Sequence, residues 1–324
     1  MADNLREFFA LMGPAEWLVL SLTIAGSLAI WGLALWFLLA RFRRSRRPLT
    51  GFRRCLPAAV WLAAAAYGAL FLYARFVEPD ELYVRRLCFA SPKLPRGETL
   101  RLLHLTDIHA RQGREAQLAR AADAAAALRP DLLLLTGDYL CDYTHGAPTA
   151  FLTFLFHLPD VPAYAVTGNY GGRYVPDPFL ETLGIETLHT ETRLLTIRGL
   201  PLELHGASPT RSAPTVRPRV HPEWFGIFLE HFPALFPQAA AAGWDLFLAG
   251  HTHGGQVRLP GYGALITLDR RGKEFEWGAY RLGGSVGYVN AGLGMECTGL
   301  PQVRFLCPPE IALIEVTGTG YSPR

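Results

Sequence analysis

The chain has 324 residues, of which half are hydrophobic and only 18% are charged. This length allows one large domain or two ordinary ones, and the apolar content excludes a disordered or low-complexity protein. The formal charge of +3 is unevenly distributed: residues 1–76 carry nine basic and three acidic side chains, whereas residues 77–324 carry 22 and 25. Because the larger part is slightly acidic, we predict that no nucleic acid is bound.

Two apolar runs within residues 1–76 predict a membrane anchor. Residues 17–39 contain no charge, which is enough for a helix that spans a bilayer and too long for a secretory signal. Residues 56–74 form a second, weaker run that is rich in alanine. We therefore predict one or two transmembrane helices, followed by a separate domain over residues 77–324.

Seven arginines lie between the two runs, within residues 41–54. A short basic loop of this kind usually stays in the cytoplasm, and a twin-arginine export signal is disfavoured because a complete span precedes it. If both runs span the membrane, the following domain lies outside the cytoplasm. If the second run only lies on the membrane surface, the domain stays inside. The loop favours the first arrangement, whereas Arg75, Arg85 and Arg86 weaken it.

After residue 98, short apolar runs alternate with helical patterns, which is typical of a layered α/β domain. Strands are predicted at 100–105, 132–135, 164–166, 225–229, 246–249, 288–289 and 311–316. Helices are predicted at 117–128 and 150–157, and a long loop at 208–223. The five cysteines are odd in number and form no CxxC pair, so we predict neither a disulfide framework nor a zinc ribbon, and we interpret Cys141 as a buried thiol.

Polar side chains follow five of the predicted strands, at the point where each strand ends. In chain order these are Asp107 and His109, then Asp138, then Asn169, then His231, and finally His251 and His253. Each group alone fits a turn or a loop histidine. Five such groups, each after an apolar run, indicate one site, because ligands of α/β sheets gather at the carboxyl ends of the strands.

The residue types in this set indicate a metal site. Carboxylate, imidazole and amide donors without thiolate suit Mn, Fe, Zn or Mg rather than a structural zinc. A carboxylate shared by two ions would hold them about 3.5–4 Å apart, the spacing used for displacement at phosphorus. Glycines next to the donors, at Gly137, Gly168 and Gly250, allow tight turns and a close approach by phosphate.

These motifs resemble the calcineurin-like metallophosphoesterases, over roughly residues 78–317. The string GHTHGGQ at 250–256, with the Gly-rich tail around 292–311, is similar to a bacterial, membrane-linked branch of that family. The resemblance implies a four-layer α/β/β/α sandwich with two central sheets, preceded here by one or two transmembrane helices. It also implies a hydrolase with two divalent metal ions, among which manganese is favoured.

Site by site, the resemblance implies two ions that share one carboxylate, with a metal-activated water attacking phosphorus. Asp107, His109 and His253 would hold one ion, Asn169, His231 and His251 would hold the other, and Asp138 would bridge both.

One residue departs from the family pattern. The family usually has Gly-Asn-His, whose histidine contacts phosphate and protonates the leaving group, whereas this chain has Tyr170. A phenol is a poor proton donor at neutral pH. Three interpretations follow: activity is lost, or Arg173 or an arginine of the 208–223 loop supplies charge to the phosphate, or the leaving group needs no acid. A phosphate that leaves from an anhydride fits the third interpretation.

We therefore expect hydrolysis of a pyrophosphate or phosphodiester in a membrane-associated substrate. Within this resemblance, one group cleaves UDP-2,3-diacylglucosamine to lipid X and UMP in lipid A biosynthesis, and that substrate is both amphipathic and a pyrophosphate. It lies on the cytoplasmic side of the bacterial inner membrane, whereas the arginine loop favours an exported domain. The first alternative is therefore an exported cell-envelope phosphoesterase acting on lipid phosphates or nucleotides.

Two further alternatives belong to other classes. A non-catalytic metal- or phosphate-binding module fits Tyr170 but is opposed by the complete donor set. Amidohydrolases also use a His-x-His pair, but there it follows an early strand, whereas here it comes late. The sequence leaves the metal, the membrane side and the oligomeric state open.

Overall fold

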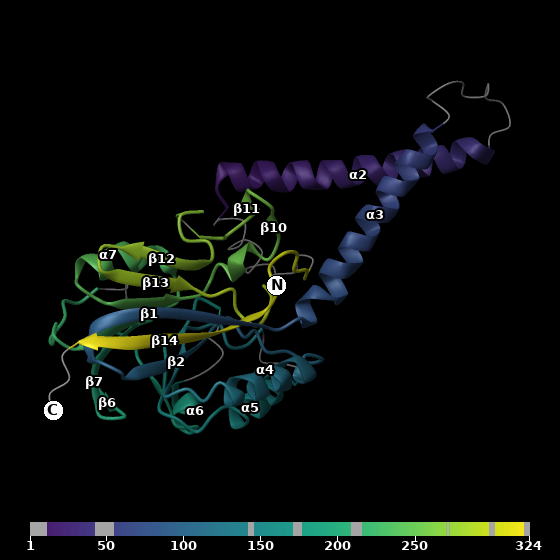
Figure 1. Cartoon of the computed structure of the whole chain (residues 1–324). Coiled ribbons are helices and arrows are strands. Elements are labelled where there is room, and N and C mark those ends of the chain that lie inside the picture. The colour runs from purple at the N-terminus through teal and green to yellow at the C-terminus, as the bar shows by residue number, and fades with distance from the viewer. Residues whose placement is uncertain are drawn as a thin grey trace.

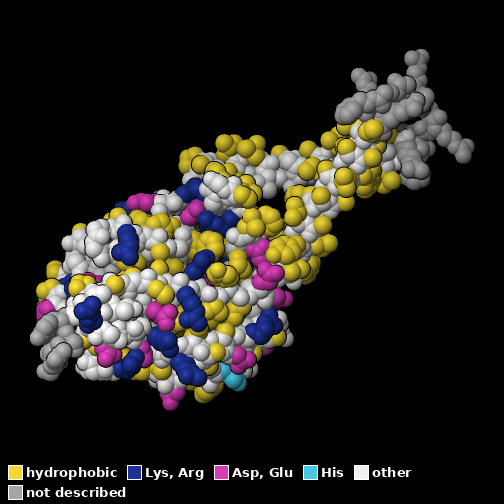
Figure 2. Space-filling model, in the orientation of Figure 1, with side chains coloured by type: hydrophobic (Ala, Val, Ile, Leu, Met, Phe, Trp, Pro, Cys, Tyr) yellow, Lys and Arg dark blue, Asp and Glu magenta, His cyan; other side chains and the backbone are white. Residues whose placement is uncertain are grey.

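Two long apolar helices, α2 (Pro14–Phe42) and α3 (Leu56–Phe76), extend from the rest of the chain (Figure 1). The computed structural model describes residues 12–42, 55–141, 146–170, 177–208, 216–269, 271, 273–297 and 302–320, so most of the arginine-rich loop lies outside the described residues. Both helices are candidate membrane spans, and only 6% of the most apolar window of each is buried, unlike a core helix. Hydrophobic side chains cover them, whereas charged side chains gather on the domain (Figure 2).

The first of two six-stranded sheets has the order β1-β14-β2-β3-β4-β5. Its strands are β1 (Tyr83–Pro95), β14 (Glu310–Gly320), β2 (Thr99–Leu105), β3 (Leu132–Leu135), β4 (Ala163–Ala165) and β5 (Ile185–Thr187). Strands β2 to β5 are parallel to one another, and β14 is antiparallel to β2. Strand β1 was not predicted, because this edge strand alternates exposed and partly buried residues and has no continuous apolar run.

The second sheet has the order β12-β13-β9-β8-β7-β6. Its strands are β12 (Gly278–Leu282), β13 (Ser285–Val289), β9 (Leu246–Ala249), β8 (Phe225–Glu230), β7 (Leu200–Ala207) and β6 (Thr192–Ile197). The four central strands are parallel and the two outer ones antiparallel. The five strands predicted to precede the site all lie within one residue of their predicted bounds. The β6–β7 hairpin was not predicted.

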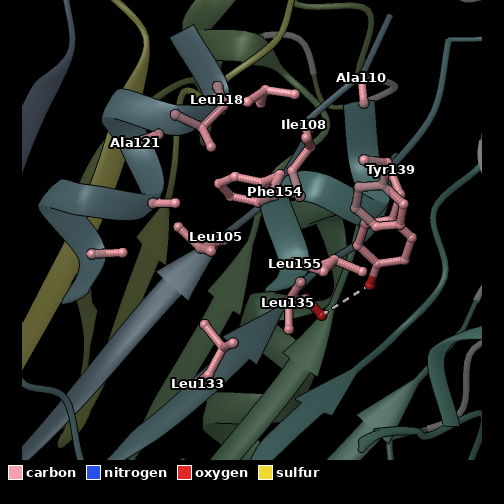
Figure 3. Close-up of a cluster of buried hydrophobic side chains, with 14 of the residues drawn as sticks. Leu105, Ile108, Ala110, Leu118, Ala121, Leu133, Leu135, Tyr139, Phe154 and Leu155 are labelled. Atoms are coloured by element: carbon pink, nitrogen blue, oxygen red, sulfur yellow. Dashed lines mark hydrogen bonds between the residues drawn. The ribbon is translucent and has the colours of Figure 1, made fainter. Parts of the chain in front are cut away.

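Apolar side chains fill three interfaces and define four layers. One cluster lies between the two sheets and includes Leu102, Leu134, Leu204 and Ile227. A second packs the first sheet against α4 (Glu115–Ala127), α5 (Ala147–Phe156) and α6 (Asp177–Glu181) (Figure 3). A third covers the second sheet with α7 (Phe236–Ala241). The layer order confirms the predicted α/β/β/α sandwich. Short elements complete the fold: η2 (Glu78–Asp80), η4 (Pro233–Leu235), η5 (His253–Gly255), β10 (Arg258–Leu259) and β11 (Gly263–Ala264).

Hydrogen bonds tie both long helices to the domain. At the end of α3, the Ala74 carbonyl accepts from the Arg304 backbone N–H at 2.8 Å, and the buried Glu78 carboxylate accepts from the Leu306 N–H at 2.9 Å. At the start of α2, Glu16 Oε1 accepts from the Thr267 N–H at 2.8 Å. The position of each helix is therefore set by contacts with the domain.

Candidate metal centre

All seven predicted metal donors come together at one edge of the sandwich. Strands β2, β3 and β4 are neighbouring and parallel, as are β8 and β9, so their carboxyl ends meet at this edge. The donors directly follow those ends: Asp107 and His109 follow β2, Asp138 follows β3, Asn169 follows β4, His231 follows β8, and His251 and His253 follow β9. Six are buried, and Asn169 is exposed.

The first cluster contains Asp107, His109 and His253. The two imidazole Nε2 atoms are 3.2 Å apart, and His253 Nε2 lies 3.4 Å from Asp107 Oδ1. The other carboxylate oxygen, Asp107 Oδ2, accepts from Thr106 Oγ1 and from the His251 N–H. Asp107 Oδ1 is buried and has no hydrogen-bond partner among the described residues. An unpaired buried carboxylate oxygen is costly unless a cation or a donor meets it.

The second cluster contains Asn169, His231 and His251. The side-chain oxygen of Asn169 lies 2.9 Å from His231 Nε2 and 3.0 Å from His251 Nδ1. The remaining ring nitrogens donate to backbone carbonyls, His231 Nδ1 to Thr136 at 2.7 Å and His251 Nε2 to Leu268 at 3.0 Å. These bonds fix the ring orientations and leave the other nitrogens directed toward Asn169, as is usual for metal-ligating histidines.

Asp138 lies between the two clusters. Its Oδ2 atom is 3.3 Å from His231 Nε2 and 3.7 Å from His109 Nε2. Its Oδ1 atom accepts from the Tyr170 backbone N–H at 2.8 Å. A single carboxylate that reaches both clusters can be shared by two ions.

The electrostatics of the clusters fit divalent cations. Burial lowers the pKa of His109 to about 4 and that of His251 to about 3, so both rings are neutral and offer lone pairs. At His231, burial also lowers the pKa, but the Asp138 carboxylate outweighs it and raises the pKa to about 10. Without a metal ion, the His231 ring therefore holds a second proton, at a position where oxygen atoms of Asp138 and Asn169 also converge. Protons and metal ions compete for such positions.

The backbone around these donors adopts an uncommon conformation. Five of them have positive φ angles: Asp107 (46°), His109 (41°), Asp138 (54°), His251 (68°) and His253 (50°). Each such residue costs on the order of 1–3 kcal/mol, and they persist only where the surrounding structure holds them. Two glycines permit this packing: a Cβ at Gly168 would lie 2.1 Å from Asp138 Oδ1, and one at Gly250 would lie 2.1 Å from Asp107 Oδ2.

Of the two remaining predicted site residues, Tyr170 is at the site. Its ring lies edge-on to the His109 ring, with 5.6 Å between centroids. Arg173 lies outside the described residues. In the 208–223 loop, Arg219 is buried and pairs with Glu203 and Asp245. Asp245 precedes β9, at the end of the strand opposite the donors, so Arg219 does not serve the site.

A loop after β13, with residues 290–294, supports the site. Its glycines contributed to the family resemblance, but its contacts with the donor segment were not predicted. Its Leu293 and Gly294 N–H groups donate to the carbonyls of Thr106 and Asp107. The buried guanidinium of Arg304 in turn donates to carbonyls of this loop, at Ala291, Gly292 and Gly294. The sequence signal for this packing is the pair of glycines: a Cβ at Gly292 would lie 2.6 Å from Asp107 Cβ, and one at Gly294 would lie 2.6 Å from His109 Cβ.

A disulfide joins Cys141 to Cys297, 156 residues apart, so the interpretation of Cys141 as a buried thiol was wrong. The odd number of cysteines concealed this pair, because Cys55, Cys88 and Cys307 are free. The bond links the segment after β3 to the segment after β13, and Cys297 Sγ lies 3.2 Å from His109 Nδ1. The disulfide thereby holds two loops next to a predicted metal donor.

We expect removal of this disulfide to destabilise the domain. Replacing Cys297 by serine should cost about 2–4 kcal/mol, because a long loop is no longer closed in the unfolded chain, which corresponds to a fall in Tm of about 5–15 °C. Thermal unfolding with and without dithiothreitol measures this change. Cys88→Ser, at an exposed free cysteine, serves as the control and should leave Tm unchanged. An unchanged Tm of the native chain under reductant would contradict the expectation.

The comparisons with known proteins agree with this geometry. The family model for calcineurin-like phosphoesterases matches residues 100–255, a range that contains all seven donors. The uncharacterized metallophosphoesterase YkuE of Bacillus subtilis is 28% identical over 86% of this chain and 99% of its own length. The phosphodiesterase YaeI of Escherichia coli is 28% identical over 82% of this chain and 98% of its own length. The UDP-2,3-diacylglucosamine pyrophosphatase LpxG of Chlamydia trachomatis is 25% identical over 75% of this chain and 92% of its own length.

The fold and the donor cluster thus define a metallophosphoesterase. Residues 100–255 of the chain belong to the calcineurin-like phosphoesterases, a family of metal-dependent hydrolases.

Proposed function

We propose that this enzyme hydrolyses a phosphodiester or pyrophosphate bond in a lipid substrate at the bacterial inner membrane. One observation carries the proposal: seven donors of the types preferred by catalytic divalent ions converge at one edge of the sandwich, in a chain that begins with two candidate membrane spans. Metal sites of this composition support displacement at phosphorus. The predicted boundary between an anchor at 1–76 and a hydrolase domain at 77–324 is part of the proposal.

The roles of the residues follow from their positions. Asp107, His109 and His253 would hold one ion, Asn169, His231 and His251 the other, and Asp138 both. Bound ions would polarise the phosphate oxygens and lower the pKa of water. Thr136 and Leu268 orient two of the imidazoles through their carbonyls, and the Tyr170 backbone N–H orients Asp138. Mixed oxygen and nitrogen donors without thiolate suit Mn, Fe, Zn or Mg, and among these we propose manganese, the ion that the resemblance to the family favours.

UDP-2,3-diacylglucosamine is the first specific substrate we propose. Two relatives are named as UDP-2,3-diacylglucosamine pyrophosphatases, and each aligns with about three quarters of this chain. The substrate combines a lipid with a pyrophosphate, which fits both the candidate membrane helices and Tyr170. Its products would be lipid X and UMP, and the hydrolase domain would face the cytoplasm.

The disulfide favours a second candidate, an exported enzyme that acts on lipid phosphates or nucleotides. Structural disulfides persist mainly outside the cytoplasm, and the arginine-rich loop points to the same topology. Reporter fusions placed after residue 90 distinguish the two candidates. Alkaline phosphatase activity of such a fusion would place the domain outside and exclude the UDP-lipid substrate.

The proposed function is tested with the purified full-length chain. We expect manganese-dependent hydrolysis of bis(p-nitrophenyl) phosphate, lost on chelation and restored by the metal. A panel of UDP-2,3-diacylglucosamine, nucleoside diphosphates and alkyl phosphodiesters then identifies the substrate class. Absence of hydrolysis of every compound by metal-loaded, folded protein would overturn the proposal and favour the non-catalytic binding module.

A further inference from the structure

A cavity of about 210 Å³ lies between α2 and the GHTHGGQ segment (residues 250–256). In Figure 1, the N-terminal part of α2 passes beside β10 and β11, close to this segment. Val19, Leu20 and Thr23 form the helix wall, and Leu265, Ile266 and Leu268 lie on the domain side. Most of the lining surface is apolar, which is unusual for the immediate neighbourhood of a metal centre.

The cavity reaches the candidate metal centre through the GHTHGGQ segment. Thr252 and His253 line it, and His253 also belongs to the first donor cluster, with its Nε2 atom 3.4 Å from Asp107 Oδ1. A molecule with its phosphate at the donors can therefore extend an apolar part toward α2. Because Leu268 lines the cavity while its carbonyl orients His251, the second cluster borders the cavity as well.

Contacts of α2 with the domain set the other side of the cavity. Glu16 lies one turn before Leu20 and accepts from both the N–H and the Oγ1 of Thr267. The neighbouring faces of α2 expose large aliphatic side chains, such as Leu18 at 60% and Leu22 at 62%. Figure 2 shows that this apolar surface continues along the helix. If α2 enters the membrane, the cavity is thus bordered by a surface that contacts lipid.

We propose that this cavity receives a hydrocarbon chain of the substrate, so that α2 forms part of the substrate site and not only an anchor. The inference rests on the proposed function and specifies its substrate as an acylated or alkylated phosphate. A nucleotide base or a sugar is a poor occupant, because the described residues that line the cavity include no Phe, Tyr or Trp and, apart from His253 and Glu296, no ionisable side chain. The volume corresponds to roughly seven water molecules, enough for several methylene groups.

The test compares two phosphodiesters that share the p-nitrophenyl leaving group and differ only in the second ester, methyl or dodecyl. The full-length enzyme is assayed with manganese in phospholipid nanodiscs. Each buried methylene group contributes roughly a fourfold gain in binding, so we expect kcat/KM for the dodecyl diester to exceed that for the methyl diester by about 100-fold or more. The gain should appear mainly in KM.

Variants on both walls and a matched control locate the effect. Leu20→Trp on α2 and Ile266→Trp on the domain fill the cavity, and we expect each to reduce the ratio of kcat/KM for the dodecyl diester to that for the methyl diester by at least about 10-fold. Leu18→Trp makes the same change two residues away, on the opposite face of the helix, at an exposed position that does not line the cavity. It should leave both rates unchanged, and membrane partitioning of the substrate is the same for all variants.

A second readout does not depend on turnover. A dodecyl phosphate with a terminal diazirine should crosslink on irradiation to the 16–27 and 265–268 segments of the native chain, and this crosslink should be lost in Leu20→Trp but not in Leu18→Trp. The inference would be overturned if all variants preferred the dodecyl diester to the same degree. It would also be overturned if the probe crosslinked but the native enzyme showed no preference for the dodecyl diester, since the cavity would then hold at most a bilayer lipid. Failure to hydrolyse either diester would refute the proposed function, and the crosslinking pattern would still decide the occupant.

Discussion

Asp138→Asn should lower the rate of manganese-supported phosphodiester hydrolysis by at least about 10³-fold. The Asp138 carboxylate lies between the two clusters, with its Oδ2 atom 3.3 Å from His231 Nε2 and 3.7 Å from His109 Nε2. An amide of the same shape keeps the packing but removes the negative charge that two cations would share, and the loss of such electrostatic stabilisation is costly in a buried site. The metal content, measured by mass spectrometry of the purified protein, should fall from two ions to one or fewer.

A control on the same strand separates this effect from general damage. Asp131 precedes β3, at the opposite end from Asp138, and its carboxylate accepts from the Arg101 N–H. Asp131→Asn should retain activity within about threefold of the native enzyme, because exposed or partly exposed polar contacts contribute little. If Asp138→Asn retained more than a tenth of the native activity with full metal content, the assignment of Asp138 as the shared ligand would be incorrect.

The site residues that could be predicted from the sequence are those that directly follow a strand. A continuous apolar run such as 132–135 predicts a strand buried on both faces, and the first polar residues after it must lie at the carboxyl end. Five such positions therefore predicted which polar residues meet at this edge before any long-range contact was known. The sandwich itself came from the resemblance of these motifs to a known family.

The features that could not be predicted depend on contacts between distant segments. The carbonyls of Thr136 and Leu268, which orient His231 and His251, belong to the backbone and have no residue-type preference. The Cys141–Cys297 pair joins segments 156 residues apart, and cysteine spacing does not determine connectivity. Strand β1 likewise gains its place by pairing with β14, more than 200 residues later.

The position of α2 also arises from the tertiary structure. Hydropathy predicts that the helix is long enough to cross a membrane, but not that its first turns lie against the domain. That contact depends on Glu16 and Thr267, an isolated pair that no periodic pattern reveals. It is this contact that places Val19 and Leu20 beside the GHTHGGQ segment, and so connects this candidate membrane span to the candidate metal centre.

Tyr170→His should change the range of leaving groups rather than the overall rate. A histidine near neutral pKa can protonate a leaving oxygen, which contributes about 10²–10⁴-fold when that oxygen is strongly basic. Hydrolysis of a dialkyl phosphate, whose leaving group is an alkoxide, should therefore rise by about 10²-fold. Hydrolysis of a nucleoside diphosphate-type pyrophosphate should stay within about threefold, because its phosphate leaving group requires no proton.

The geometry makes this substitution interpretable. Tyr170 contacts Asp138 through its backbone N–H, so exchanging the side chain leaves that hydrogen bond in place. Tyr170→Phe is the matched control, since it removes only the hydroxyl, and it should follow the native enzyme on both substrates. Steady-state kcat/KM for the two substrate types measures the contrast. If Tyr170→His hydrolysed the pyrophosphate far better than the native chain, the native reaction would need an acid that Tyr170 does not provide, and a pyrophosphate substrate would no longer explain this residue.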